Sequence, residues 1–148
     1  MSKLLLPLVL LFVSLTCFGI TYTPEQITMF RKGAERGEYG SQWMLGVAYD
    51  RGNGVPENDT EAAKWYRKAA EQGHAWAQSN LGFLYGTGSG VPEDDTVAYM
   101  WWNIAAAQGN EDAKKNKGLI SKIMTKEQIA EAQKLSREWM AKHSEKNK

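Results

Sequence analysis

Residues 45–73 read LGVAYDRGNGVPENDTEAAKWYRKAAEQG, and residues 81–109 read LGFLYGTGSGVPEDDTVAYMWWNIAAAQG. The second stretch repeats the first 36 positions later, from Leu45 to Leu81, without an insertion. A fixed period of this length is typical of solenoids, in which each unit buries its apolar face only against neighbouring units. The repeat therefore predicts a stacked solenoid, a class of protein that usually presents an extended binding surface.

Each copy of the repeat is expected to fold as two helices joined by a glycine-rich loop. The spacing predicts helices over 39–50 and 59–72 in the first copy, and over 74–86 and 95–108 in the second. Asn58 and Asp94 stand where a side chain can cap the second helix of each copy. No segment shows the alternation that a strand would need. The predicted fold class is all-α, an α-solenoid of antiparallel helix pairs (an α/α superhelix).

The repeated apolar positions define the expected core. The first helix of each copy carries Leu-Gly-x-x-Tyr, in which leucine and tyrosine, four residues apart, share one helix face. The glycine lets the second helix approach closely, and a tryptophan of the second helix fills the volume between copies. The predicted repeat core consists of Leu45, Gly46, Tyr49, Trp65, Leu81, Gly82, Tyr85 and Trp101.

Partial copies flank the two complete ones within a solenoid domain over 20–143. We expect a half-repeat over 23–37, repeats over 38–73 and 74–109, and a degenerate repeat over 110–124. A capping box at Thr125 and Gln128 begins an amphipathic helix over 125–143, which would cap the last repeat. Residues 144–148 are predicted to be a disordered tail.

The first 19 residues have the order of a secretory signal peptide. Lys3 is followed by an apolar run over 4–13 and by small or weakly polar residues, with cleavage expected near Gly19. The apolar run is shorter than the roughly 20 residues that span a bilayer. We therefore expect an exported protein, periplasmic or secreted. Cys17 leaves a lipidated leader as an alternative, although the three residues before it match a lipoprotein signal poorly.

The composition argues against several partners and chemistries. The chain has 18 Lys and Arg against 17 Asp and Glu, and this balance gives no case for nucleic acid. Cys17 is the one cysteine, so removal of the leader would also remove thiol chemistry. His74 and His143 have no partner at metal-ligand or catalytic-triad spacing. We expect no catalytic residue, no metal and no cofactor, and contact with a membrane only through an uncleaved or lipidated leader.

The string Leu-Gly-x-x-Tyr-x-x-Gly-x-Gly-Val-x-x-Asp, followed by Ala-x-x-Trp-Tyr-x-Lys-Ala-Ala-x-Gln-Gly, resembles the Sel-one-like repeat (SLR), a relative of the tetratricopeptide repeat. Residues 45–73 and 81–109 carry it, with Asn58 and Trp102 as departures. The resemblance implies a right-handed α-superhelix that acts as a scaffold for protein–protein contacts. It also implies that the first helix of each pair lines the inner, concave face.

That inner face gives the candidate partner-binding residues. At 100° per residue, Trp76 and Phe83 fall within about 20° of each other and away from the core positions of the same helix. Asp50 and Lys115 would fix the polarity of a bound peptide. The full set is Trp43, Val47, Asp50, Trp76, Ser79, Phe83 and Lys115. The alternative for the aromatic residues is packing against a neighbouring helix or the half-repeat.

The predicted function is an exported, non-enzymatic scaffold that binds a peptide or protein segment in its concave groove. One cysteine-rich branch of the family is described as β-lactamase-like or penicillin-binding, which makes a cell-wall-directed hydrolase an alternative. This chain lacks the cysteines of that branch. A further alternative is an inhibitor or immunity partner of one specific toxin or enzyme.

Overall fold

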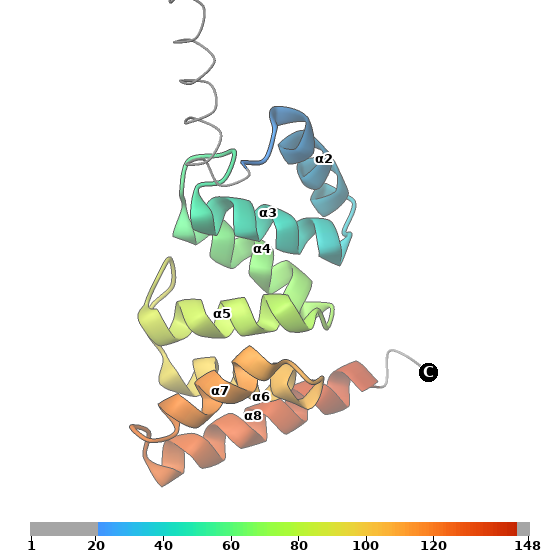
Figure 1. The fold of residues 1–148 in the computed structure, drawn as a ribbon. Helices are drawn as coiled ribbons and strands as arrows, with labels where there is room; N and C mark the ends of the chain where they lie inside the picture. Colours follow the sequence, from blue (N-terminus) through green and yellow to red (C-terminus); the bar gives the residue numbers. More distant parts are fainter. Residues whose placement is uncertain (1–20, 145–148) are drawn as a thin grey trace, which may run out of the picture.

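The computed structural model describes residues 21–144 (Figure 1). Within this range the chain forms seven helices and no strand: α2 (Pro24–Glu35), α3 (Tyr39–Arg51), α4 (Asp59–Glu71), α5 (Ala75–Thr87), α6 (Asp95–Ala107), α7 (Glu111–Ile120) and α8 (Lys126–Ser144). None of these helices is long and apolar enough to cross a membrane. The predicted signal peptide, with Cys17, and residues 145–148 lie outside the described residues.

Local side chains mark where the helices begin. Asn58 and Asp94 cap α4 and α6, and each accepts a hydrogen bond of 3.0 Å from the backbone N–H three residues further on. Thr23 and Thr125 precede α2 and α8 in capping boxes, each with a glutamine three residues on. The four helices of the two complete repeats begin and end within one residue of their expected positions, because these signals are local.

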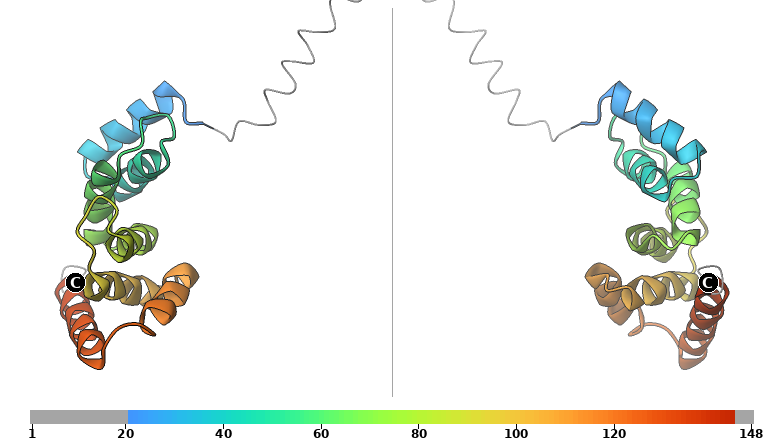
Figure 2. Two further views of the ribbon diagram at one scale, coloured as in Figure 1. Left: turned by 90° about the vertical axis from the view of Figure 1, so that its left-hand side faces the viewer. Right: turned by 90° about the vertical axis from the view of Figure 1, so that its right-hand side faces the viewer.

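The helices stack as successive antiparallel pairs, α3 with α4 and α5 with α6, and each pair packs on the next (Figure 1). Figure 2 shows α3, α5 and α7 along one side of a curved stack and α4, α6 and α8 along the other, with the curve open toward α3, α5 and α7. The predicted fold class, an α-solenoid of helix pairs with a C-terminal capping helix, is confirmed. α3 and α5 are therefore inner helices.

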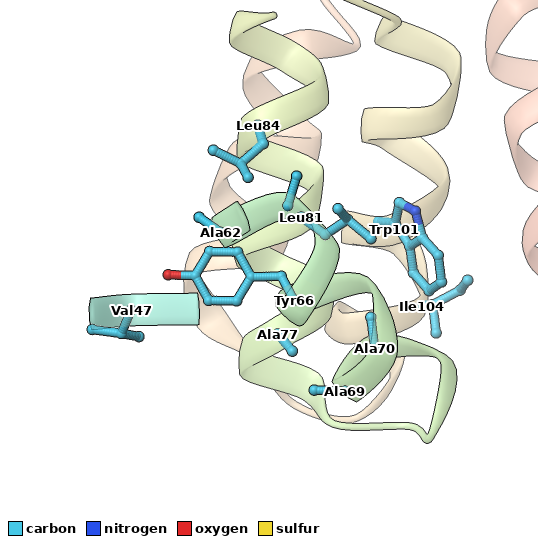
Figure 3. Packing of buried hydrophobic residues seen from close by; sticks show 11 residues of the cluster. Val47, Ala62, Tyr66, Ala69, Ala70, Ala77, Leu81, Leu84, Trp101 and Ile104 are labelled. Atoms are coloured by element: carbon cyan, nitrogen blue, oxygen red, sulfur yellow. The ribbon is translucent and has the colours of Figure 1, made fainter. Parts of the chain in front are cut away.

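The core contains contacts within each helix pair as well as contacts between neighbouring pairs. The central cluster contains residues of α3, α4, α5 and α6 (Figure 3). Its residues Tyr66, Leu81, Leu84 and Ile104 are at most 1% exposed. A second cluster joins α6 to α7 and α8, and a third joins α2 to α3 and α4. Burying one such leucine contributes about 1.5–3 kcal/mol. Since every cluster draws on more than one pair, each pair depends on its neighbours.

The predicted core positions lie in or against these clusters. Leu45, Trp65, Leu81 and Trp101 are buried, and Gly46 and Gly82 are buried within α3 and α5. Tyr49 and Tyr85 are partly buried and pack against the clusters.

Gly46 and Gly82 allow the two helices of each pair to approach closely. A Cβ atom at Gly46 would lie 2.5 Å from Cδ1 of Tyr66, and one at Gly82 would lie 2.8 Å from Nε1 of Trp102. At Gly118, the same position of the degenerate repeat, a Cβ atom would meet nothing within 4 Å. The glycine is therefore required by packing only in the two complete repeats.

The last helix, α8, covers α6 and reaches the central cluster. Trp139 packs edge-on against Trp101, with ring centroids 5.7 Å apart. Ala132 and Ser136 are fully buried on the same side of α8. The apolar side of the amphipathic helix thus covers the exposed end of the stack. α8 continues to Ser144, the first residue of the segment expected to be a disordered tail.

Candidate functional site on the inner face

Three aromatic side chains of the inner helices are half exposed. Tyr39, on α3, is 54% exposed, and Trp76 and Phe83, on α5, are each 53% exposed. Trp76 and Phe83 are seven residues apart, about two helical turns, so they lie on one side of α5. Exposed apolar side chains that gather on one face mark interaction surfaces in soluble proteins. The structure therefore keeps Trp76 and Phe83 as candidates for partner contact.

His74 connects the two inner helices through aromatic contacts. Its ring lies 5.4 Å from that of Tyr39 and 5.3 Å from that of Trp43, between centroids. Its Nδ1 accepts a hydrogen bond of 3.2 Å from the backbone N–H of Ala77 and so caps α5. Burial lowers the pKa of His74. The neutral ring is thus the form that suits this position, because a protonated Nδ1 could not accept the bond.

Trp43 is more enclosed than Trp76. It packs against the central cluster, and its Nε1 is the one buried side-chain polar atom without a hydrogen-bond partner among residues 21–144. Leaving such a group unpaired costs about 1–3 kcal/mol. Because its indole packs against the central cluster, Trp43 contributes to the packing of α3. Packing was the alternative to partner contact that the sequence left open for this residue.

Asp50 is engaged in a hydrogen-bond chain across three helices. The hydroxyl of Tyr66 donates to Oδ2 of Asp50 at 3.1 Å and accepts from Nδ2 of Asn80 at 3.1 Å. Burial raises the pKa of Asp50, and burial together with the Asp50 carboxylate raises the pKa of Tyr66. This chain joins α3, α4 and α5, so the carboxylate has a structural partner within the protein.

The structure does not bring the seven predicted inner-face residues together. Val47 is 7% exposed and belongs to the central cluster, and Ser79 is 6% exposed. The indole Nε1 of Trp102 donates to the backbone oxygen of Ser79 at 3.0 Å, so that side of α5 is covered by α6. Val47 and Ser79 are therefore not accessible for partner contact, which corrects their assignment. Lys115 is exposed on α7.

A ladder of glutamine amides was missed by the sequence reasoning. Gln42 and Gln78, 36 residues apart, are buried and donate through Nε2 to the backbone oxygens of Ala34 and Ala70. Their Oε1 atoms accept from Nε2 of Gln72 and Gln108, each at 2.7 Å. Both members of each pair repeat with the 36-residue period, which was the available signal, but the period does not show that the two glutamines, thirty residues apart, contact each other.

The geometry suits binding more than chemistry. Within the described residues, no three His, Cys, Asp or Glu side chains gather where they could hold a metal ion. The inner face instead offers aromatic surface on α5, beside the Tyr39, His74 and Trp43 rings. These features define the class of protein: an α-solenoid built from repeated helix pairs, with exposed aromatic side chains on its inner helices.

The model of the Sel1 repeat matches residues 40–74 and 77–110. The chain therefore contains Sel1 repeats at two positions, and its resemblance to the Sel-one-like repeat family is confirmed. Proteins of this family are typically protein-interaction scaffolds. No curated protein matched the chain.

The solved structures that are similar to this chain include the following two. A protective antigen of uropathogenic Escherichia coli strains, which displays an SLR fold, is 36% identical over 81% of this chain, with a TM-score of 0.78. A Sel1 repeat protein from Oxalobacter formigenes is 40% identical over 56% of this chain, with a TM-score of 0.55. The matches cover 26% of the first protein and 63% of the second, so this chain spans only part of their length.

Proposed function

We propose that this protein is an exported, non-enzymatic interaction module that binds a peptide or protein segment on its inner face. Trp76 and Phe83 are the anchors of this contact. Aromatic side chains are enriched among the residues that dominate binding energy at interfaces. The scaffold role that is typical of Sel1 repeats supports the proposal.

The observation that carries the proposal is the difference between equivalent positions of the two repeats. Phe83 stands where the first repeat has Val47, and Trp76 stands where it has Gly40. Val47 is buried, whereas Phe83 and Trp76 are half exposed. The helix pair forms in the first repeat without either aromatic residue, so the repeat itself does not require them.

A peptide-display selection against the purified protein tests the proposal. Selected peptides are then titrated against the wild type and the Trp76→Ala/Phe83→Ala variant. We expect the double variant to bind at least about tenfold more weakly, because it removes two anchors. The matched control is Met29→Ala/Ile123→Ala, which removes two exposed apolar side chains outside α3, α5 and α7 and should leave affinity unchanged.

Circular dichroism establishes that both variants keep the helical content of the wild type. If the selected peptides bind the Trp76→Ala/Phe83→Ala variant as tightly as the wild type, the inner-face assignment is wrong. A nitrocefin assay on the same preparation checks the non-enzymatic part of the proposal, and we expect no turnover.

Export rests on the order of charged, apolar and small residues over 1–19. Mass spectrometry of the protein from a fractionated bacterial culture tests it. We expect a periplasmic or secreted chain that begins at Ile20. An intact chain in the cytoplasm would contradict export, and a lipid on Cys17 would establish the alternative leader.

A further inference from the structure

Three helices end at one edge of the solenoid. Because the repeat places α4 and α6 in the same orientation, their carboxyl ends lie on the same edge, and α8 ends there too. A cavity of about 590 Å³ lies between these ends. The residues that matter for its chemistry are Glu71, Gln72, Gln108, Trp139, His143 and Ser144. The volume falls within the range of small-ligand pockets.

The electrostatics of this cavity favour a positive charge. The carboxyl end of each helix carries a partial negative charge, and three such ends line one space. Glu71 adds a full negative charge and forms no ion pair within residues 21–144. None of the described residues that line the cavity is a lysine or an arginine.

The glutamine ladder fixes which amide atoms remain for a ligand. Backbone oxygens only accept hydrogen bonds, so Gln42 and Gln78 must donate to them through Nε2 and accept through Oε1. Gln72 and Gln108 must then donate their own Nε2 to those oxygens. Their Oε1 atoms take no part in the ladder. Both glutamines line the cavity, and no hydrogen bond within residues 21–144 uses their Oε1 atoms, so these acceptors are available to a ligand.

His143 brings a further acceptor. Its Nδ1 lies 2.8 Å from the backbone oxygen of Trp139, and since that oxygen only accepts, Nδ1 carries the hydrogen. Nε2 is then the acceptor atom of the neutral ring. The ring stacks on Trp139 with centroids 3.7 Å apart. Together with Ile104 and Met140, the stacked pair forms an apolar wall.

We propose that this cavity binds an organic cation, an ammonium or guanidinium group on an alkyl stem. Such a group supplies several N–H donors and a positive charge to a site lined by a carboxylate, amide oxygens and an imidazole nitrogen. The apolar wall receives the alkyl stem. The site lies among α4, α6 and α8, on the other side of the stack from the aromatic residues of the inner face, so it is independent of the proposed function.

Titration of the isotopically labelled protein by NMR tests the proposal. The probes are 1,5-diaminopentane as a free amine, N-acetyl-lysine-N-methylamide as a lysine side chain, and the norleucine analogue as its neutral counterpart. We expect saturable shifts of the Trp139 indole and of the Gln72 and Gln108 side-chain amides with one or both cations. The norleucine analogue should cause none. The cation that binds more tightly identifies the source, a free amine or a peptide side chain.

The diagnostic variant is Glu71→Gln, which keeps the shape of the side chain and removes its charge. We expect it to weaken cation binding about tenfold. The matched control is Glu35→Gln, at the equivalent last position of α2, which should bind as the wild type does. Equal binding of the neutral analogue, an unchanged affinity in Glu71→Gln, or no saturable shift with either cation would each overturn the proposal. The Trp76→Ala/Phe83→Ala variant should still bind the cation, which separates this test from that of the inner face.

Discussion

Val47 and Phe83 occupy the same position of consecutive repeats, yet Val47 is buried and Phe83 is 53% exposed. By contrast, Leu45 and Leu81 also occupy one repeat position, and both are at most 1% exposed. The two repeats therefore agree where side chains hold the stack together and differ on the surface that the stack presents. Positions that repeat explain the fold, and positions that break the repeat are the ones to examine for function.

The largest expected effect is the loss of a repeated leucine. Leu45→Ala and Leu81→Ala should each lower the free energy of unfolding by about 2–5 kcal/mol, because each leaves a cavity in a cluster between helix pairs. Urea denaturation measures both. Leu119→Ala, at an exposed position, should change the free energy of unfolding by less than about 0.5 kcal/mol. If only one of the two repeated leucines proved costly, the equivalence of the repeats would fail.

The next largest effect on stability is expected at Gly46, the glycine that lets α3 and α4 pack closely. Gly46→Ala should destabilise the protein by about 1–3 kcal/mol, because the new methyl group would collide with the Tyr66 ring. Gly118→Ala, at the same position of the degenerate repeat, should instead stabilise it by about 0.5–1 kcal/mol, since α7 has room for the methyl group. Thermal or urea denaturation measures both changes in stability. If the two substitutions changed stability in the same direction, the difference between the complete and the degenerate repeat would be contradicted.

The fold was predictable from the sequence because its determinants are local or periodic. Asn58 and Asp94 cap the helices that they were expected to cap, and the 36-residue period placed Leu45 and Leu81 together in the core. The same reasoning predicted that Trp76 and Phe83 share one side of α5, and both are exposed there.

The rest of the site depends on contacts that the period does not contain. Ser79 was assigned to the inner face, but Trp102, which replaces the tyrosine of the first repeat, covers it from α6. The aromatic contact of Tyr39 with His74 joins the start of α3 to the start of α5, across more than thirty residues. The cavity at the carboxyl edge needs the position of α8, which the degenerate third repeat does not specify.

A smaller effect, on the pH dependence of stability, is expected from the residues that cap two equivalent helices, α5 and α7. His74 caps α5 and Asn110 caps α7, each by accepting from the backbone N–H three residues on. Burial lowers the pKa of His74 below its usual 6.5, so the unfolded chain takes up this proton more readily than the folded one. Stability from His74 is thus present at neutral pH and is lost as the pH falls below about 6.5.

His74→Asn should keep the cap and remove this part of the pH dependence. Urea denaturation of the wild type and the variant between neutral and mildly acidic pH measures it. We expect the wild type to lose unfolding free energy relative to the variant as the pH falls. A difference between the two proteins that stays constant over this range would show that His74 does not titrate as described.

The central claim is that Trp76 and Phe83 belong to a binding surface and are not needed by the fold. The most direct measurement is the free energy of unfolding of Trp76→Ala/Phe83→Val, in which valine is the residue of the first repeat. We predict a decrease of no more than about 1 kcal/mol, as for surface substitutions. A decrease of about 3 kcal/mol or more, as for core truncations, would contradict the claim and assign both side chains to packing.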